Sequence, residues 1–144
     1  MTTASVNFQF LQSHDLQLLR LSVLAEGYVW NQPKTCLVKL CYFGQLLTQL
    51  IAARTGNFHS TVENQTDLLR QLELKGILPQ KVALLFHQIR VVSDRATYEH
   101  TSDPSQALTI LKIARQSAVW FHRTFGGNTT FTPNPFISPP DQVS

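Results

Sequence analysis

The sequence predicts an all-α protein: a helical bundle of about five helices, four long and one short, with a proline-rich extended C-terminal tail. In the stretch Ala107–Gly126, small and apolar residues recur at steps of four and three, as one buried face of a helix requires. Prolines and glycines fall where helices are expected to begin and end. No stretch alternates between apolar and polar residues over the length of a strand. We therefore expect a helical domain over residues 1–127 and a tail or linker over residues 128–144.

The first predicted helix spans Asp15–Trp30, and the second begins at Pro33, where the missing N–H of proline costs nothing. The second helix should end at Gly56. Gly44 in its middle costs roughly 1 kcal/mol relative to alanine, so we expect a neighbouring helix to approach closely there. The residues expected to face inward are Leu16, Leu19 and Val23 in the first helix, with Leu24 as a further candidate, and Cys36, Leu37, Leu40, Phe43, Leu47 and Leu50 in the second.

A polar connection over residues 57–63 separates these helices from a shorter one, Thr66–Lys75, which Gly76 ends. Pro79 opens the fourth predicted helix, and residues 100–102 form a turn after it. The expected inward residues of the fourth helix are Val82, Leu85, Phe86, Ile89 and Val92.

The last helix is introduced by Asp103-Pro104-Ser105-Gln106, which resembles a capping box. Its inward residues are Ala107, Leu111, Ala114, Ala118, Phe121 and Phe125. After Gly126, the last 17 residues hold four prolines and show no periodicity, so they should be extended. If the tail contacts the bundle, Phe131 and Phe136 are the side chains expected to anchor it.

Composition limits the classes of function. The 144 residues suffice for one packed core, and 43% of them are hydrophobic, as in a folded soluble protein. No uninterrupted apolar run approaches the roughly 20 residues of a membrane helix, and the N-terminus lacks a secretory pattern. We expect a cytoplasmic protein without a membrane partner. Cys36 and Cys41 lie five residues apart, which suits neither a zinc pair nor a redox pair, so we expect buried thiols and no metal or other cofactor.

Several stretches resemble the N-terminal helical domain of type I restriction enzyme R subunits, a domain family of unknown function. They run in order through nearly the whole chain. The matching stretches are residues 7–11, 25–28, 33–40, 43–47, 76–79, 85–90, 95–97, 120–126 and 135–141. In R subunits this domain precedes a nuclease region and an ATP-dependent translocase.

The resemblance implies a role in DNA restriction and translocation, whereas the residues of this chain carry neither chemistry. The sequence has no Gly-x4-Gly-Lys-Ser/Thr loop for the phosphates of a nucleotide. It also lacks the acidic cluster with lysine that a metal-dependent nuclease needs. We therefore predict a non-catalytic interaction module whose partners are other restriction-system subunits or domains, with a homodimer as a further possibility. The interaction candidates are Tyr98, Trp120 and His122.

The domain is also distantly similar to the HEPN superfamily of helical bundles, which includes metal-independent ribonucleases. Such enzymes use an arginine and a following histidine, which can move a proton and stabilise a charged phosphorane. At the corresponding place this chain has Arg90, then Ser93, Asp94 and Tyr98 instead of the glycine, asparagine and histidine of the R-subunit relatives. A ribonuclease is the alternative hypothesis.

In that alternative, Arg95 and His100, separated by four residues, would supply the chemistry, with Arg90 and Tyr98 as further catalytic candidates. The competing interpretation is that Arg95 is a solvated charge and His100 a turn residue. His87 and Arg90, three residues apart, could lie beside this pair or on an ordinary solvated face.

Nucleic-acid binding is a weaker third hypothesis, because the net charge of only +3 comes from scattered residues. Its candidate residues are Lys39, Arg90, Arg95, Arg115 and Arg123. Trp120, His122 and Arg123 could form a surface on which bases stack, or they could seal the end of the bundle. A further expectation is an internal polar pair in which Glu26 and Tyr28 face Lys39 or Arg115.

Overall fold

The computed structural model describes residues 7–57, 65–98, 103–127 and 129–140, except for the side chains of Thr97 and Tyr98. These ranges contain five α-helices, one short 3-10 helix and no strand, which confirms the predicted all-α class. The elements are η1 (Gln9–Ser13), α1 (Leu16–Tyr28), α2 (Pro33–Arg54), α3 (Gln65–Leu74), α4 (Gln80–Tyr98) and α5 (Pro104–Phe125).

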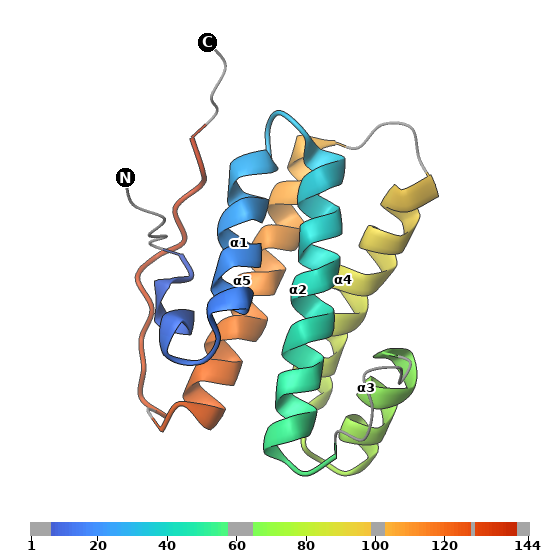
Figure 1. Cartoon of the computed structure of the whole chain (residues 1–144), viewed down its shortest axis with the longest axis vertical. Helices are drawn as coiled ribbons and strands as arrows, with labels where there is room; N and C mark the ends of the chain where they lie inside the picture. Colours follow the sequence, from blue (N-terminus) through green and yellow to red (C-terminus); the bar gives the residue numbers. More distant parts are fainter. Residues whose placement is uncertain (1–6, 58–64, 99–102, 128, 141–144) are drawn as a thin grey trace.

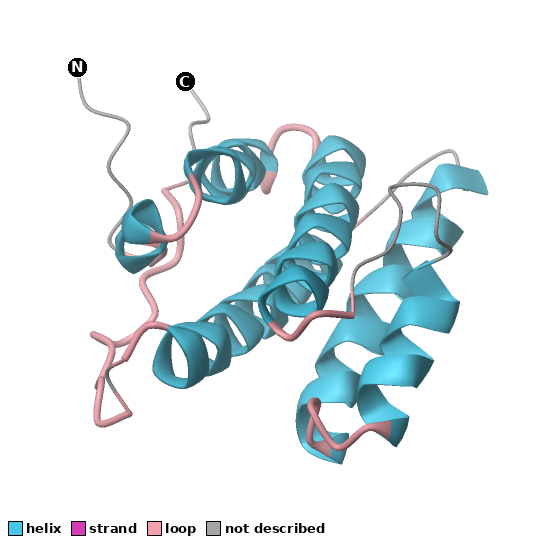
Figure 2. Cartoon of the chain, turned by 60° about the horizontal axis from the view of Figure 1, so that its bottom comes forward, coloured by secondary structure: helices cyan, strands magenta, loops and turns pink. Residues whose placement is uncertain are grey.

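The four long helices run alternately up and down, and the short α3 packs across the lower end of α2 and α4 (Figure 1). Residues 129–140 leave the lower end of α5 and run back up the outside of the bundle beside η1. Figure 2 shows the same extended segment between α5 and η1, on the side of the molecule away from α3. We call residues 129–140 the strap.

Helix α2 is the centre of the bundle because it contacts α1, α3, α4 and α5. Among the described residues it is also the one helix long and apolar enough to cross a membrane, with a mean hydropathy of 1.4. Half of that apolar window is buried inside the protein. Since its neighbours cover it on several sides, the apolar composition of α2 is explained by its place in the core. The α2 side chains that are fully buried are Cys36, Leu37, Leu40, Phe43, Leu47, Thr48, Ile51 and Ala52.

The predicted helix boundaries are largely confirmed. Pro33 opens α2, and Asp103 caps α5 by accepting a hydrogen bond of 2.9 Å from the Ser105 N–H. Gly56 follows α2 with φ +74°, a conformation that glycine adopts without the steric penalty other residues meet. A Cβ on Gly44 would lie 3.4 Å from Ile89 Cγ2, so the expected close approach of a helix is that of α4.

The inward face predicted for α1 was right for Leu19, which is buried, and for Val23, which packs half-buried against the core, but wrong for Leu16 and Leu24. Leu16 is 64% exposed and Leu24 is 37% exposed, whereas Leu18, Leu21 and Ser22 are buried. Leucine occurs at so many positions of this helix that two apolar faces are possible. The chain buries the face with Ser22 and Ala25, whose small side chains allow close packing, and the Ser22 hydroxyl is satisfied by the Leu19 carbonyl at 2.6 Å.

In the other predicted seams, the residues expected inward are buried or half-buried, with Leu50, Leu85, Val92 and Phe125 among the half-buried ones. Helix η1 was not predicted, because five residues with a single buried side chain, Leu11, carry no usable periodicity. The predicted turn over residues 100–102 lies outside the described residues, as does nearly all of the predicted connection over 57–63.

Candidate functional site

The strap is anchored by two aromatic rings, the two that the sequence suggested. The Phe131 ring lies 5.1 Å from the ring of Phe10 and 4.5 Å from that of His122. The Phe136 ring packs partly buried against the core, and Lys112 Nζ lies 5.6 Å from its centre. The tail therefore forms part of the surface of the bundle along this side.

Polar bonds to backbone atoms hold the strap as well. The Asn7 side chain pairs with Ile137 twice: its Nδ2 donates to the Ile137 carbonyl at 2.8 Å, and its Oδ1 accepts from the Ile137 N–H at 2.9 Å. Asn7 is only 2% exposed. Trp30 Nε1 donates to the Pro139 carbonyl at 2.7 Å, and Arg123 Nε donates to the Phe131 carbonyl at 2.7 Å. These bonds fix the strap at several points along its length.

Arg115 connects the strap to the other end of the chain. Its Nε donates to the Asn7 carbonyl at 3.0 Å, and its Nη2 donates to the Asn134 carbonyl. Burial lowers the pKa of Arg115, and the nearby charge of Glu26 acts in the opposite direction. Glu26 also accepts from Asn7 Nδ2 at 2.7 Å. Of the suggested internal polar pairs, the structure thus supports the electrostatic interaction of Glu26 with Arg115.

Along the strap lies a groove of about 450 Å³, which we call the α5 groove. Two rows of α5 residues, each with a spacing of four, form its floor, and two strap residues form its wall. The lining residues are Lys112, Gln116, Trp120, Arg115, Val119, Arg123, Pro133 and Phe136. Three candidates from the sequence, Arg115, Trp120 and Arg123, therefore meet in one place.

His122 lies next to the groove, in contact with His14. His14 Nε2 and His122 Nδ1 are 2.9 Å apart, a hydrogen bond in which one ring nitrogen donates and the other accepts. Burial lowers the pKa of both histidines, and the charges of Arg54 and His122 lower that of His14 further. This hydrogen bond requires at least one neutral imidazole, because one ring nitrogen must accept. The contact between η1 and α5 should therefore weaken at acidic pH, where both rings become protonated.

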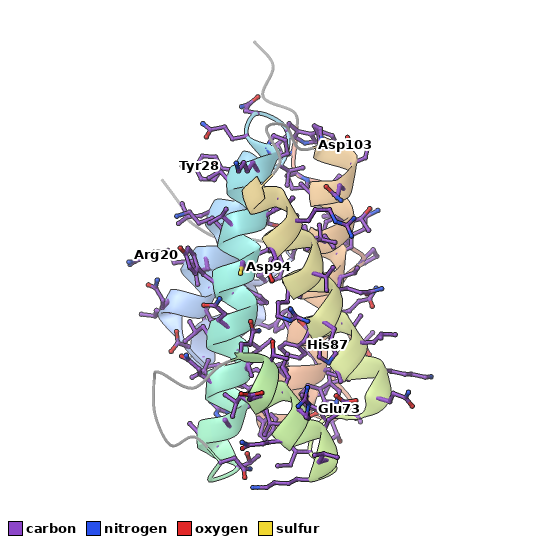
Figure 3. All side chains as sticks on the ribbon, turned by 90° about the vertical axis from the view of Figure 1, so that its right-hand side faces the viewer. Arg20, Tyr28, Glu73, His87, Asp94 and Asp103 are labelled. Atoms are coloured by element: carbon purple, nitrogen blue, oxygen red, sulfur yellow. The ribbon has the colours of Figure 1, made fainter. Side chains whose placement is uncertain are left out.

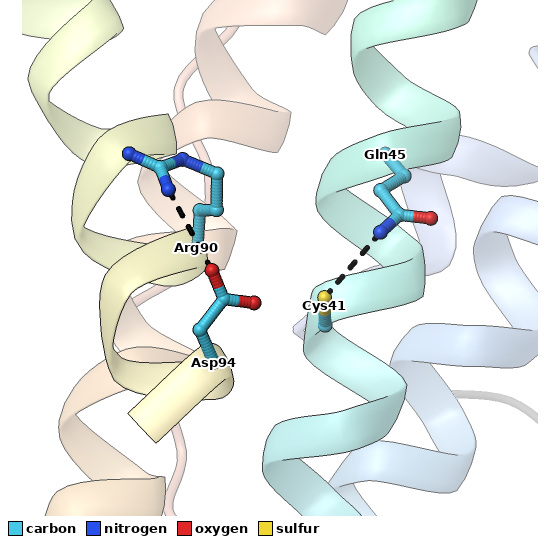
Figure 4. A network of polar contacts seen from close by, with 4 residues as sticks. All are labelled: Cys41, Gln45, Arg90 and Asp94. Carbon is cyan, nitrogen blue, oxygen red and sulfur yellow. Dashed lines mark hydrogen bonds and ion pairs between the residues drawn. The ribbon is translucent and has the colours of Figure 1, made fainter. Parts of the chain in front are cut away.

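Two further polar pairs, one within α4 and one within α2, face each other where these helices pack. Figure 4 shows Arg90 pointing to Asp94 on α4, at 3.6 Å, and Gln45 pointing to Cys41 on α2, at 3.5 Å. Burial raises the pKa of Cys41, as does the charge of Asp94, while the Gln45 hydrogen bond and Arg90 oppose the shift. Cys41 is half-buried, so the expectation of full burial is confirmed only for Cys36, whose pKa burial raises to about 12.

The motif around Arg90 contributes to helix packing. The Ser93 hydroxyl donates to the Leu37 carbonyl at 3.0 Å and so ties α4 to α2. Arg90 Nε is buried and donates to no described residue. His87 Nε2 on α4 lies 3.6 Å from Glu73 Oε1 on α3, and Figure 3 shows both residues below Asp94.

Arg90, Arg95 and Lys39, the remaining candidates whose side chains the structure describes, do not line the α5 groove. Arg95 is exposed on α4, and Lys39 is half-buried on α2. His100 lies outside the described residues, and so does the side chain of Tyr98, so the convergence of Arg95 with His100 stays a prediction. Within the described ranges, no three residues among His, Cys, Asp and Glu are grouped as metal ligands would be.

Sequence reasoning missed Lys112, Gln116, His14 and Asn7. The first two could have been found, because residues 112, 116 and 120 occupy one row of the helix at a spacing of four. Asn7 and His14 could not, since their partners are 130 and 108 residues away in the chain.

Comparison with known proteins finds one informative similarity. The chain is 26% identical over 133 residues to the endonuclease subunit of the type I restriction enzyme EcoKI from Escherichia coli K12. The aligned region covers 92% of this chain but only 11% of that subunit. No family model and no solved structure matches the chain. The similarity supports a relation to the restriction subunit, and it does not extend to the HEPN superfamily.

Proposed function

We propose that this chain is a non-catalytic helical module of a type I restriction system, acting through contact with other polypeptides of that system. The observation that carries the proposal is the similarity to a restriction endonuclease subunit along 92% of the chain. Because the chain corresponds to 11% of that subunit, the activity of the whole enzyme is not transferred to it.

The bundle offers exposed apolar side chains that a protein partner could cover. Leu16 and Leu24 lie on α1, eight residues apart, with 64% and 37% of their surfaces exposed. A second pair lies at the α3 side of the molecule, where Leu74 is 81% exposed and Leu84 is 57% exposed. Burying such leucines contributes favourable free energy to association, at about 25 cal/mol per Å² of apolar surface. Tyr98 and Trp120 remain proposed interaction residues.

Capture of restriction subunits tests the proposal. The tagged chain is expressed with the modification and specificity subunits of a type I system from the same genome, and the complex is sought by affinity purification and gel filtration. We expect co-elution at a defined stoichiometry. Elution of the chain alone, with all subunits folded and present, would contradict the proposal. Gel filtration of the chain by itself tests the homodimer.

Two matched leucine pairs locate the contact. Leu16→Gln with Leu24→Gln alters the α1 pair, and Leu74→Gln with Leu84→Gln alters the α3 and α4 pair by the same chemistry. Loss of capture in only one double variant assigns the interface to that face. If both variants retain capture, substitution of Trp120 is the next test.

A further inference from the structure

Two features of the α5 groove select its ligand: fixed positive charge and half-buried aromatic surface. Lys112, Arg115 and Arg123 all line it, and none of its lining residues is acidic. Arg115 is 8% exposed and is held by two backbone carbonyls, while Arg123 is held at Nε by the Phe131 carbonyl. Arg123 is therefore oriented before any ligand arrives, which reduces the entropy cost of binding an anion. Arg115, whose Nε and Nη2 donors are already bonded, adds positive charge at the floor of the groove.

The apolar part of the groove is suited to a flat group. Trp120 and Phe136 are both half-buried and both line the groove, with Val119 and Pro133 beside them. The Trp120 ring is supported by the edge of Phe125, with ring centres 5.9 Å apart. The volume of about 450 Å³ falls within the usual range for small-ligand sites.

We infer that the α5 groove binds a nucleotide unit, with the base against Trp120 and the phosphate at Arg123, about one helical turn away. Lys112, about 12 Å from Trp120 along the helix, is placed for a neighbouring phosphate. An acidic peptide would satisfy the cations but would leave the aromatic surface without a planar partner. A nucleotide supplies both groups at once, since every base has a π-face and every nucleotide a phosphate. The inference goes beyond the proposed protein contact and does not depend on it.

Two sources share this chemistry: a free nucleotide and one unit of a single-stranded nucleic acid. Single strands expose their bases for stacking, whereas a duplex hides them. The Gln116 amide on the groove floor can donate and accept hydrogen bonds, which suits a base edge. The experiment below separates the two sources.

The 144-residue chain is titrated into fluorescein-labelled oligothymidylate of about 12 nucleotides, and binding is followed by anisotropy at several salt concentrations. Lys112→Gln with Arg123→Gln should weaken binding about tenfold and reduce the dependence on salt, because phosphate contacts are lost. Arg70→Gln with Lys81→Gln removes the same charge from exposed positions on α3 and α4, and should leave affinity nearly unchanged. Equal losses in the two double variants would overturn the site.

Trp120 is tested by two substitutions that differ in their π-face. Trp120→Leu keeps apolar volume and should weaken binding about tenfold or more, whereas Trp120→Phe keeps a stacking ring and should bind nearly as well as the wild type. Equal affinity of the two variants overturns the stacking role, even if both are somewhat less stable. Because Arg123 also donates to the strap, Lys112→Gln alone serves as the variant that leaves the strap hydrogen bonds described above intact.

Competition separates the sources and provides the final control. Displacement of the labelled strand by free thymidine monophosphate indicates a site for free nucleotides, and displacement by unlabelled oligonucleotide alone indicates a strand site; both support the inference. Polyglutamate serves as a competitor that carries negative charge but no bases. If it displaces the labelled strand as effectively as the oligonucleotide does, negative charge alone explains binding and the inference of a nucleotide site is overturned. So would the absence of binding at low salt.

Discussion

The two sides of the bundle are held together by different kinds of interaction. On the side of α2 and α4, apolar side chains such as Phe43 and Phe86 pack at full burial, and the sequence pattern anticipated most of them. On the side of α5 and the strap, hydrogen bonds from Asn7, Trp30 and Arg115 reach backbone carbonyls far away in the sequence. The apolar packing of α2 and α4 stabilises the fold, whereas the hydrogen bonds of the strap hold the residues that form the wall of the α5 groove. Perturbations of the two sides should therefore have separable effects.

Truncation of a core ring should have the largest effect. Phe86 is fully buried on α4, so Phe86→Ala should lower the free energy of unfolding by about 3–5 kcal/mol. Urea unfolding followed by circular dichroism measures it. A loss below about 1 kcal/mol would show that this side of the core is not close-packed.

Removal of the Asn7 amide should release the strap while the helices stay folded. Asn7→Ala leaves the Ile137 backbone and Glu26 without their Asn7 partners, at a cost of about 1–3 kcal/mol. We expect faster proteolysis within residues 129–140 at unchanged helix content. Asn31→Ala, at an exposed position, is the control. A strap that is cleaved at the same rate in both variants would mean that the Asn7 pairing does not hold it.

Acid should loosen the same region through the two histidines. Their folded-state pKa values lie below the ordinary value of 6.5, so the unfolded chain binds protons more readily. The stability that the neutral histidine pair contributes is therefore fully present above about pH 6.5 and is lost as the pH falls through the lowered pKa values of the folded state. Proteolysis of the strap between about pH 7 and 5 measures this effect, and His14→Gln should reduce the pH dependence. A strap equally resistant at both pH values would contradict the role of the pair.

Arg95→Ala should have the smallest effect on the fold. The side chain is exposed near the end of α4, so stability should change by at most about 0.5 kcal/mol. The same variant, with His100→Ala, tests the ribonuclease hypothesis. We expect no RNA cleavage by the wild type or by either variant under matched conditions, as a binding module requires. Cleavage by the wild type that both substitutions abolish would establish the alternative.

The sequence predicted the helices well because their signals are local. Pro33, Gly56 and Asp103 act on neighbouring residues, and the apolar seams repeat within each helix. The inward face of α1 was predicted only in part, since a leucine-rich helix offers two apolar faces and contact with α2 and η1 selects the buried one. The sequence pattern of a single helix therefore does not identify its buried face when tertiary packing selects between two apolar faces.

The candidate site was predictable only in part, for the same reason. Trp120 and Arg123 were suggested by their crowding at the end of one helix, and they do line the groove. Its wall depends on Pro133 and Phe136, whose position is set by bonds that join distant parts of the chain. Arg90 and Arg95 lie five residues apart on α4, and neither reaches the groove that Arg115 and Arg123 share.

The pairing of Asn7 with Ile137 also has a mechanical consequence. Tension applied between residues 7 and 137 would load these two hydrogen bonds and the Arg115 bridge directly, before it reached the helices. The helices therefore bear little of a force applied to these two segments until the Asn7–Ile137 hydrogen bonds and the Arg115 bridge break. A protein pulled in this way would first lengthen by the released strap at low force, and only then lose its helices.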